Sequence, residues 1–172
     1  MRDPTTITSL ELIETYYEVI SRKLVDKFSM GYFKETNSGV FIPSSLNIIH
    51  QAFIHLIGTG VIDKAKPFLD AGCGDGRIVA LASSMGISAW GIESDEELAA
   101  LAKHNLINLA SLGVIKESDA LIYQGNFCNR KAYRVMDIKF SDFGTIYNYD
   151  NNADLLASKI VEEAKPKTVY LL

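Results

Sequence analysis

The 172-residue chain lacks most features that mark secreted or membrane proteins. It has only two cysteines, Cys73 and Cys128, which cannot form the disulfide framework of a small secreted domain. We therefore expect a reducing, cytoplasmic location. No apolar run approaches the roughly 18 residues that a membrane span needs, and the N-terminus lacks the basic start and apolar core of a secretory signal. No membrane is expected as a partner.

Positive charge is also scarce. Seventeen Lys and Arg residues stand against 21 Asp and Glu, a net charge of −4, which argues against a protein that holds nucleic acid mainly by bulk electrostatics. One basic cluster contains an aromatic residue: Arg130, Lys131, Arg134 and Lys139 surround Tyr133. We interpret it as a solvated helix face rather than an RNA-binding face, so nucleic acid is not favoured as a partner.

The rest of the composition, at 48% hydrophobic residues, is that of an ordinary globular protein. The length predicts one domain with at most a small appendage. We expect an N-terminal helical or lid segment over 1–60 and a cofactor-binding α/β domain over 61–172. His50, His55 and His104 are isolated from other metal-ligand residues, so no metal is expected.

Two helices are predicted in the N-terminal segment. Thr8 and Glu11 form a capping box, and an apolar stripe follows it. The stripe consists of Leu10, Ile13, Tyr17, Ile20, Leu24 and Phe28. It predicts a helix packed on the flank of the domain, with a cofactor lid or a dimer seam as alternatives.

A turn-rich stretch, 31–39, is expected to be a loop, and 40–43 to be extended. Ser44 or Ser45 should cap the second helix, which Gly58 and Gly60 should stop. Its buried side is predicted to carry Leu46, Ile49, Phe53, Ile54 and Ile57.

Strands and helices alternate from residue 66 onward. Strands are predicted near 67–71, 88–93, 120–125, 143–148 and 167–172. Helices are predicted near 76–85, 95–112, 129–136 and 152–164. Such alternation predicts a doubly wound α/β fold, with a mostly parallel five-stranded sheet between helices and right-handed crossovers.

The first predicted strand leads into a glycine-rich turn. Asp70 ends the apolar run, and Gly72, Gly74 and Gly76 follow before a helical pattern begins. Glycine tolerates positive φ and has no Cβ, so a ligand can press against bare backbone there. The N–H groups of the turn and the helix start should point toward that ligand. This pattern predicts a loop for a nucleotide-type cofactor.

The second predicted strand ends at Glu93. A carboxylate about 20 residues after the glycines is placed to accept the hydroxyls of a ribose. A dehydrogenase would use the same two features, but it needs a small residue at the sixth position of the loop, where this chain has Arg77. An NAD-dependent dehydrogenase is therefore a distant alternative.

The run Leu69-Asp-Ala-Gly-Cys-Gly-Asp-Gly-Arg-Ile78 resembles the first motif of class I S-adenosylmethionine-dependent methyltransferases, and the resemblance covers 40–172. It implies that S-adenosylmethionine is the cofactor, with the glycine loop facing its methionine part and Glu93 holding its ribose. Asn126 stands where the family usually has an Asp that contacts adenine, and an amide oxygen can accept the same hydrogen bond. Phe127 is expected against the adenine ring.

The fourth strand end is where this family meets its substrate. It lacks the Pro-Pro-aromatic signature of enzymes that methylate adenine or glutamine amides, and Tyr147, Asn148 and Tyr149 are the pocket candidates. Strand alternation sends the two tyrosines to one face and Asn148 to the other, so one set is expected in the core. No general base is assigned, because a nitrogen nucleophile needs chiefly desolvation and in-line placement.

The stretch from Phe41 to Ser44 looks like a lid element of archaeal and eukaryotic non-SET protein-lysine methyltransferases, as does the turn 150–152. This likeness adds Phe41 to the pocket candidates. It implies methyl transfer to a nitrogen of a protein, with a lysine side chain among the possible acceptors, or of another macromolecule.

The resemblance departs from the family at the C-terminus. Class I methyltransferases usually have seven strands, and this chain stops inside the fifth, at 167–172. We expect either a fragment or a reduced form whose edge strand dimerises or is covered by a partner. A catalytically inactive S-adenosylmethionine-binding module is the alternative to an enzyme.

Overall fold

A computed structural model describes residues 8–28, 33–36, 39–149 and 152–172. Its centre is a five-stranded sheet in the order β5-β4-β3-β6-β7, in which every neighbouring pair is parallel. The strands are β3 (Phe68–Ala71), β4 (Ala89–Glu93), β5 (Ala120–Gln124), β6 (Thr145–Tyr147) and β7 (Val169–Leu171). The predicted α/β fold with a parallel sheet is confirmed. The ends of each predicted strand lie within two residues of the ends of an observed strand.

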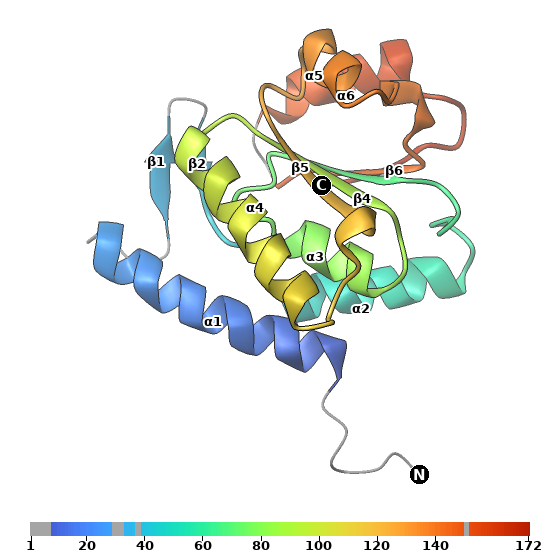
Figure 1. Cartoon of the computed structure of the whole chain (residues 1–172). Coiled ribbons are helices and arrows are strands. Elements are labelled where there is room, and N and C mark those ends of the chain that lie inside the picture. The colour runs from blue at the N-terminus through green and yellow to red at the C-terminus, as the bar shows by residue number, and fades with distance from the viewer. Residues whose placement is uncertain (1–7, 29–32, 37–38, 150–151) are drawn as a thin grey trace.

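Helices cover both faces of the sheet (Figure 1). One face carries α1 (Ser9–Phe28), α2 (Leu46–Gly58), α3 (Arg77–Ser84) and α4 (Glu96–Ser111), and the other carries α5 (Arg130–Val135) and α6 (Ala153–Glu163). Short 3-10 helices, Glu117–Asp119 and Phe140–Asp142, precede β5 and β6. No helix in the part that the structure describes is long and apolar enough to cross a membrane.

Each strand contributes side chains to two hydrophobic cores, one on each face of the sheet, because successive side chains of a strand point to opposite faces. Phe68 packs with the α1–α4 core, and its neighbour Leu69 packs with the α5–α6 core. Ile146 and Tyr147 of β6 divide in the same way. Burial on both faces explains why these strands are apolar throughout rather than alternating.

The first helix forms as its sequence predicts. The Thr8 N–H donates to Glu11 Oε2 at 2.7 Å, and the Glu11 N–H donates to Thr8 Oγ1 at 3.2 Å, which completes the capping box. Ile13, Tyr17 and Ile20 are buried against the domain, so the predicted flank packing is confirmed. The side chains of the stripe's last two members, at 24 and 28, lie outside the described part of the structure.

The predicted loop over 31–39 is wrong in part. β1 (Lys34–Thr36) pairs antiparallel with β2 (Gly39–Phe41), so the segment forms a hairpin. Turn-forming residues hid a pair of three-residue strands, which are too short to show a period of two.

The second helix differs from its prediction in two details. Ser45 is its N-cap residue but makes no side-chain capping bond. Ile54, predicted on the buried side, is 54% exposed, whereas Leu46 and Phe53 are buried. Packing of α2 on α3 and α1 selects a narrower face than the apolar pattern indicates.

Gly91 lets the glycine loop approach β4. A Cβ at this position would lie 2.7 Å from both Cys73 Sγ and Ile122 Cδ1, which is closer than a Cβ atom approaches such neighbours in proteins. The bare backbone of β4 therefore accommodates Cys73, and the loop rests directly on the sheet.

Candidate functional site

The glycine loop follows β3 at the carboxyl edge of the sheet, where parallel α/β folds bind ligands. Gly72, Gly74 and Gly76 have φ values of +89°, +53° and +81°, which L side chains rarely adopt. At Gly76 a Cβ would also come within 3.1 Å of Ala102 on α4. The sequence expectation that the loop needs glycine at these positions is confirmed.

The N–H groups of this loop bond within the protein. The N–H groups of Gly72 and Cys73 donate to the Ile92 carbonyl at 2.9 and 3.2 Å. The N–H of Gly74 donates to Glu93 Oε2 at 2.9 Å. The N–H of Gly76 donates to the Cys73 carbonyl at 2.9 Å, and the N–H of Arg77 donates to Asp75 Oδ1 at 3.3 Å. The expectation that the N–H groups point toward a ligand is wrong for these five. With five donors in use, the loop presents fewer N–H groups than a phosphate-holding nest does.

Asp70 places a buried carboxylate beside the loop. It is 2% exposed, and its side chain has no hydrogen-bond or ion-pair partner among the described residues. Burial raises the pKa of Asp70 well above its ordinary value, and the nearby charges of Glu93 and Asp75 add to the rise. No cation among the described residues pairs with this carboxylate, so its charged form is unfavourable unless a ligand supplies positive charge.

Glu93 braces the loop from the end of β4. Its Oε2 accepts the Gly74 N–H, and its Oε1 accepts the N–H of Asp95 at 2.8 Å. Oε1 also accepts the Ser94 hydroxyl at 3.4 Å, so Oε2, with its second lone pair, keeps acceptor capacity for a ligand. Its predicted role as a ribose ligand stays a prediction.

A cleft of about 520 Å³, including space open to solvent, lies beside these carboxylates. Six of the predicted cofactor and pocket residues line it: Phe41, Asp70, Gly72, Glu93, Tyr147 and Tyr149. They come from β2, from the carboxyl ends of β3, β4 and β6, and from the segments that follow β3 and β6. The fold thus brings predicted cofactor and substrate residues to one place.

The two cleft tyrosines differ in environment. Tyr147 is 4% exposed, and its hydroxyl lies 3.0 Å from Ser44 Oγ. Burial raises the pKa of Tyr147 to about 12, against a smaller lowering by the Ser44 hydrogen bond. Tyr147 therefore stays protonated at neutral pH. Tyr149 is half exposed at the rim of the cleft.

Asn148 points away from the cleft tyrosines, as strand alternation predicts. It is fully buried, and its side-chain amide donates to the Ala71 carbonyl at the end of β3. This bond ties β6 to the start of the glycine loop.

The turn after β5 holds Asn126 and Phe127. Asn126 is exposed, and its Oδ1 accepts the Cys128 N–H at 2.8 Å. Phe127 is buried, with its ring 3.7 Å from the position of a Cβ on Gly72. Phe127 therefore lies near the glycine loop, while neither residue lines the cleft itself. Their predicted contacts with adenine stay predictions.

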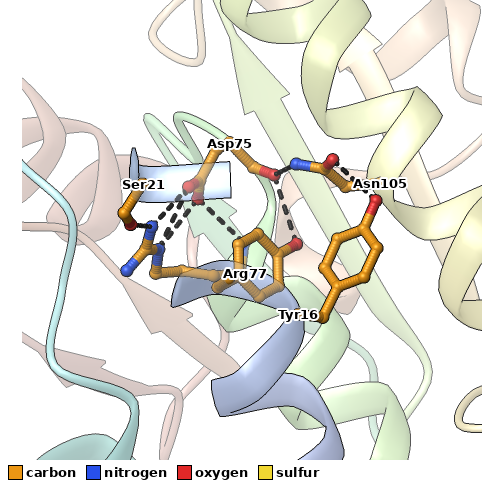
Figure 2. A network of polar contacts seen from close by, with 6 residues as sticks. Tyr16, Ser21, Asp75, Arg77 and Asn105 are labelled. Carbon is orange, nitrogen blue, oxygen red and sulfur yellow. Dashed lines mark hydrogen bonds and ion pairs between the residues drawn. The ribbon is translucent and has the colours of Figure 1, made fainter. Parts of the chain in front are cut away.

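A buried polar network fixes the glycine loop from behind (Figure 2). The Asp75 carboxylate is completely buried and binds the Arg77 guanidinium, with Nη2–Oδ2 at 2.6 Å and Nε contacts of 3.0 and 3.1 Å. The guanidinium also donates to Ser21 Oγ at 3.2 Å and stacks over the Tyr17 ring at 5.0 Å. The loop is thereby tied to α1.

The backbone of Asp75 is held as well. Its carbonyl accepts hydrogen bonds from the Tyr17 hydroxyl at 3.2 Å and from Asn105 Nδ2 at 2.9 Å, and Tyr16 donates to Asn105 at 3.0 Å. No local sequence pattern indicates this network, because Ser21 and Asn105 lie 56 and 30 residues from their partners. Only the polar pair Asp75 and Arg77, placed next to apolar helix positions, could have signalled it.

The described residues contain no group of three or more His, Cys, Asp or Glu side chains arranged to hold a metal ion. Both cysteines are free thiols. Burial raises the pKa of Cys73 well above its ordinary value, and Asp70 and Glu93 raise it further. Cys73 is therefore a packing residue rather than a reactive thiolate.

Comparison with known proteins finds similarity at the level of fold. No family model and no curated protein matches the chain. An RNA methyltransferase from Salinibacter ruber, solved with S-adenosyl-L-homocysteine, matches at 23% identity and a TM-score of 0.53 over 73% of this chain and 72% of that one. An O-methyltransferase from Bacillus cereus, also solved with S-adenosylhomocysteine, matches at 13% identity and a TM-score of 0.59 over 97% and 66%.

A glycopeptide N-methyltransferase solved with S-adenosyl-L-methionine matches at 18% identity and a TM-score of 0.51 over 70% of this chain. The present chain spans about half of that enzyme, 51%. The three matched enzymes act on different kinds of acceptor and share one α/β architecture. The chain has the Rossmann-like fold of S-adenosylmethionine-dependent methyltransferases.

Proposed function

We propose that this chain binds S-adenosylmethionine and transfers its methyl group to a nitrogen of a protein, with a lysine side chain as the favoured acceptor. The observation that carries the proposal is the buried Asp70 carboxylate, which has no partner among the described residues and faces the cleft beside Glu93. A ligand with positive charge relieves the cost of burying that carboxylate. S-adenosylmethionine carries a sulfonium and an ammonium group.

The same geometry disfavours a dinucleotide. A pyrophosphate needs free N–H donors at the loop and helix start, and here five of those donors bond instead to Ile92, Glu93, Cys73 and Asp75. Two carboxylates beside the loop would also repel its negative charge. The structure therefore offers no support for an NAD-dependent dehydrogenase.

The proposed roles of the residues follow their places around the cleft. Asp70 and the glycine loop would hold the methionine part, and Glu93 would accept the ribose hydroxyls. Asn126 would accept the adenine amino group on the second lone pair of its amide oxygen, beside Phe127. These assignments rest on the fold and on the resemblance of the loop motif.

When bound, S-adenosylmethionine supplies an electrophilic methyl group. The chain's own contribution is to orient the acceptor and to exclude water. Phe41, Tyr147 and Tyr149 offer aromatic walls that attract a cationic amine before it loses its proton. Tyr147, protonated because its pKa is about 12, can orient the acceptor by a hydrogen bond but cannot act as its base at neutral pH.

Calorimetry with S-adenosylmethionine, S-adenosylhomocysteine and NAD tests the cofactor. We expect the two adenosyl compounds to bind and NAD not to bind, and tighter binding of NAD would overturn the proposal.

Incubation of the protein with methyl-labelled cofactor and cell extract then tests the acceptor. Label that protease removes and nuclease does not supports a protein acceptor, and the reverse result identifies RNA. Cofactor binding with no labelled product would identify an inactive binding module.

The cytoplasmic location stays a prediction. Fractionation of cells that express the chain with a small tag would test it.

A further inference from the structure

Phe41 lies directly on the glycine loop. A Cβ built on Gly74 would lie 2.3 and 2.5 Å from two atoms of the Phe41 ring, so the ring packs against backbone that only glycine leaves bare. Phe41 belongs to β2 of the N-terminal hairpin, and it lines the same cleft as Asp70 and Glu93. The hairpin thus covers the loop that would face the cofactor.

Lys34 sits directly opposite Phe41 in the hairpin. The antiparallel register pairs Lys34 with Phe41, so a contact that holds Lys34 in place also holds Phe41 on the paired strand in place. The Lys34 ammonium lies 2.6 Å from Asp95 Oδ1 and 2.8 Å from Glu97 Oε2, and its side chain is only 14% exposed. Two carboxylates at the start of α4 therefore hold the hairpin.

These contacts close a ring around one side of the cleft. Asp95 caps α4 by accepting the Leu98 N–H at 2.9 Å, and its own N–H donates to Glu93. Glu93 in turn accepts the N–H of Gly74, on which Phe41 rests. The ring runs from Gly74 through Glu93, Asp95 and Lys34 to Phe41 and back to Gly74.

We propose that Lys34 is a positioning residue, which holds the β1–β2 hairpin closed over the glycine loop and thereby sets how long the cofactor stays bound. This inference rests on the proposed function, since it concerns the same cleft. This ion pair, with Lys34 and Asp95 both largely buried, should stabilise the hairpin more than a fully exposed pair would, because less water screens it. No spacing in the sequence indicates the pair, which joins residues 61 positions apart.

The test compares Lys34→Gln, Lys34→Arg and the unchanged chain. We expect Lys34→Gln to release S-adenosylhomocysteine about ten-fold faster in stopped-flow measurements, a factor equivalent to about 1.4 kcal/mol. Lys34→Arg keeps the charge and should stay within about three-fold of the unchanged chain. Lys116→Gln is the matched control, because Lys116 is an exposed lysine in the loop before β5, at the opposite end of the strands.

Hydrogen exchange of the backbone around 33–41, without cofactor, provides a second measurement. We expect faster exchange there in Lys34→Gln and unchanged exchange in Lys116→Gln. Equal exchange and equal release rates in Lys34→Gln and the unchanged chain would overturn the inference and leave the proposed function standing. If Lys34→Gln exchanges faster than the unchanged chain but neither protein binds an adenosyl compound, Lys34 does hold the hairpin and the proposed function is wrong.

Discussion

Asp70 keeps a carboxylate inside the protein, and none of the residues that the structure describes places a cation against it. Burial raises the pKa of this group, so the folded protein holds its proton more tightly than the unfolded chain does. The stabilising contribution of the protonated form is full below the ordinary Asp pKa of about 4. It is lost as the pH rises toward the raised pKa of the folded state. At neutral pH, Asp70 therefore costs stability.

Replacing Asp70 with Asn should separate stability from binding. Without ligand, Asp70→Asn is expected to unfold at higher temperature than the unchanged chain, with a gain of about 1–3 kcal/mol that grows as the pH rises above about 4. Its affinity for S-adenosylmethionine should fall by roughly ten-fold or more, because a charged contact is lost. Thermal unfolding between pH 4 and 8 and calorimetry measure the two effects.

Asp63→Asn serves as the control, since Asp63 is an exposed carboxylate far from the cleft. A loss of stability in Asp70→Asn at every pH would contradict the inference that the buried carboxylate costs stability at neutral pH.

At the scale of elements, α1 is part of the site rather than an appendage to it. It supplies Tyr17 and Ser21 to the network around Asp75 and Arg77, and it packs on α3. Loosening α1 should therefore disturb the glycine loop.

Arg77→Met tests this connection. The change leaves the Asp75 carboxylate buried without its cation, and we expect a loss of about 3–5 kcal/mol in the free energy of unfolding. The double variant Asp75→Asn with Arg77→Met should recover part of that loss, because no buried charge remains unpaired. Urea unfolding measures both variants. Equal stability of the single and double variants would show that the buried charge is not the cause.

The elements that the sequence predicted well are those with strong local signals. Apolar runs ending at glycine or an acidic residue marked β3 and β4, and the capping box of Thr8 and Glu11 marked α1. The β1–β2 hairpin was missed, because it depends on pairing between two short segments and on the contact of Lys34 with α4. Such contacts are set by tertiary packing, which periodicity does not record.

The residues of the site also fall into those that the sequence indicates and those that it does not. Asp70, the glycines and Glu93 were identified because strand ends in a parallel sheet converge at one edge. Lys34 and the Asp75–Arg77 network were missed, because their partners lie on other elements. The direction of the loop N–H groups was predicted wrongly. Glycine spacing indicates where a ligand approaches, but the acceptors on β4 decide where the N–H groups point.

For the whole molecule, the sheet order leaves β5 and β7 as edge strands. An apolar edge strand can pair with a strand of another chain, and Leu172 beside β7 is 70% exposed. Dimerisation through this edge stays a prediction, which light scattering after gel filtration can test.

We expect a species of twice the 19.0 kDa chain mass at high concentration, and we expect Leu172→Lys to shift it toward the monomer. Ile48→Lys, on the exposed face of α2, is the control for added charge. A single monomeric mass for all three proteins at every concentration would rule out the edge contact.

The unpaired carboxylate of Asp70 has one more consequence if the cleft carries out methyl transfer. Asp70 faces a ligand with a sulfonium before transfer and one with a neutral sulfur afterwards. In surroundings of low polarity, that single unit of charge changes the attraction between ligand and protein considerably. The cleft would hold the donor more firmly than the spent product, although the two differ by one methyl group. Methyl transfer would then itself weaken the hold on the product, because the reaction removes a charge that helped to retain the cofactor.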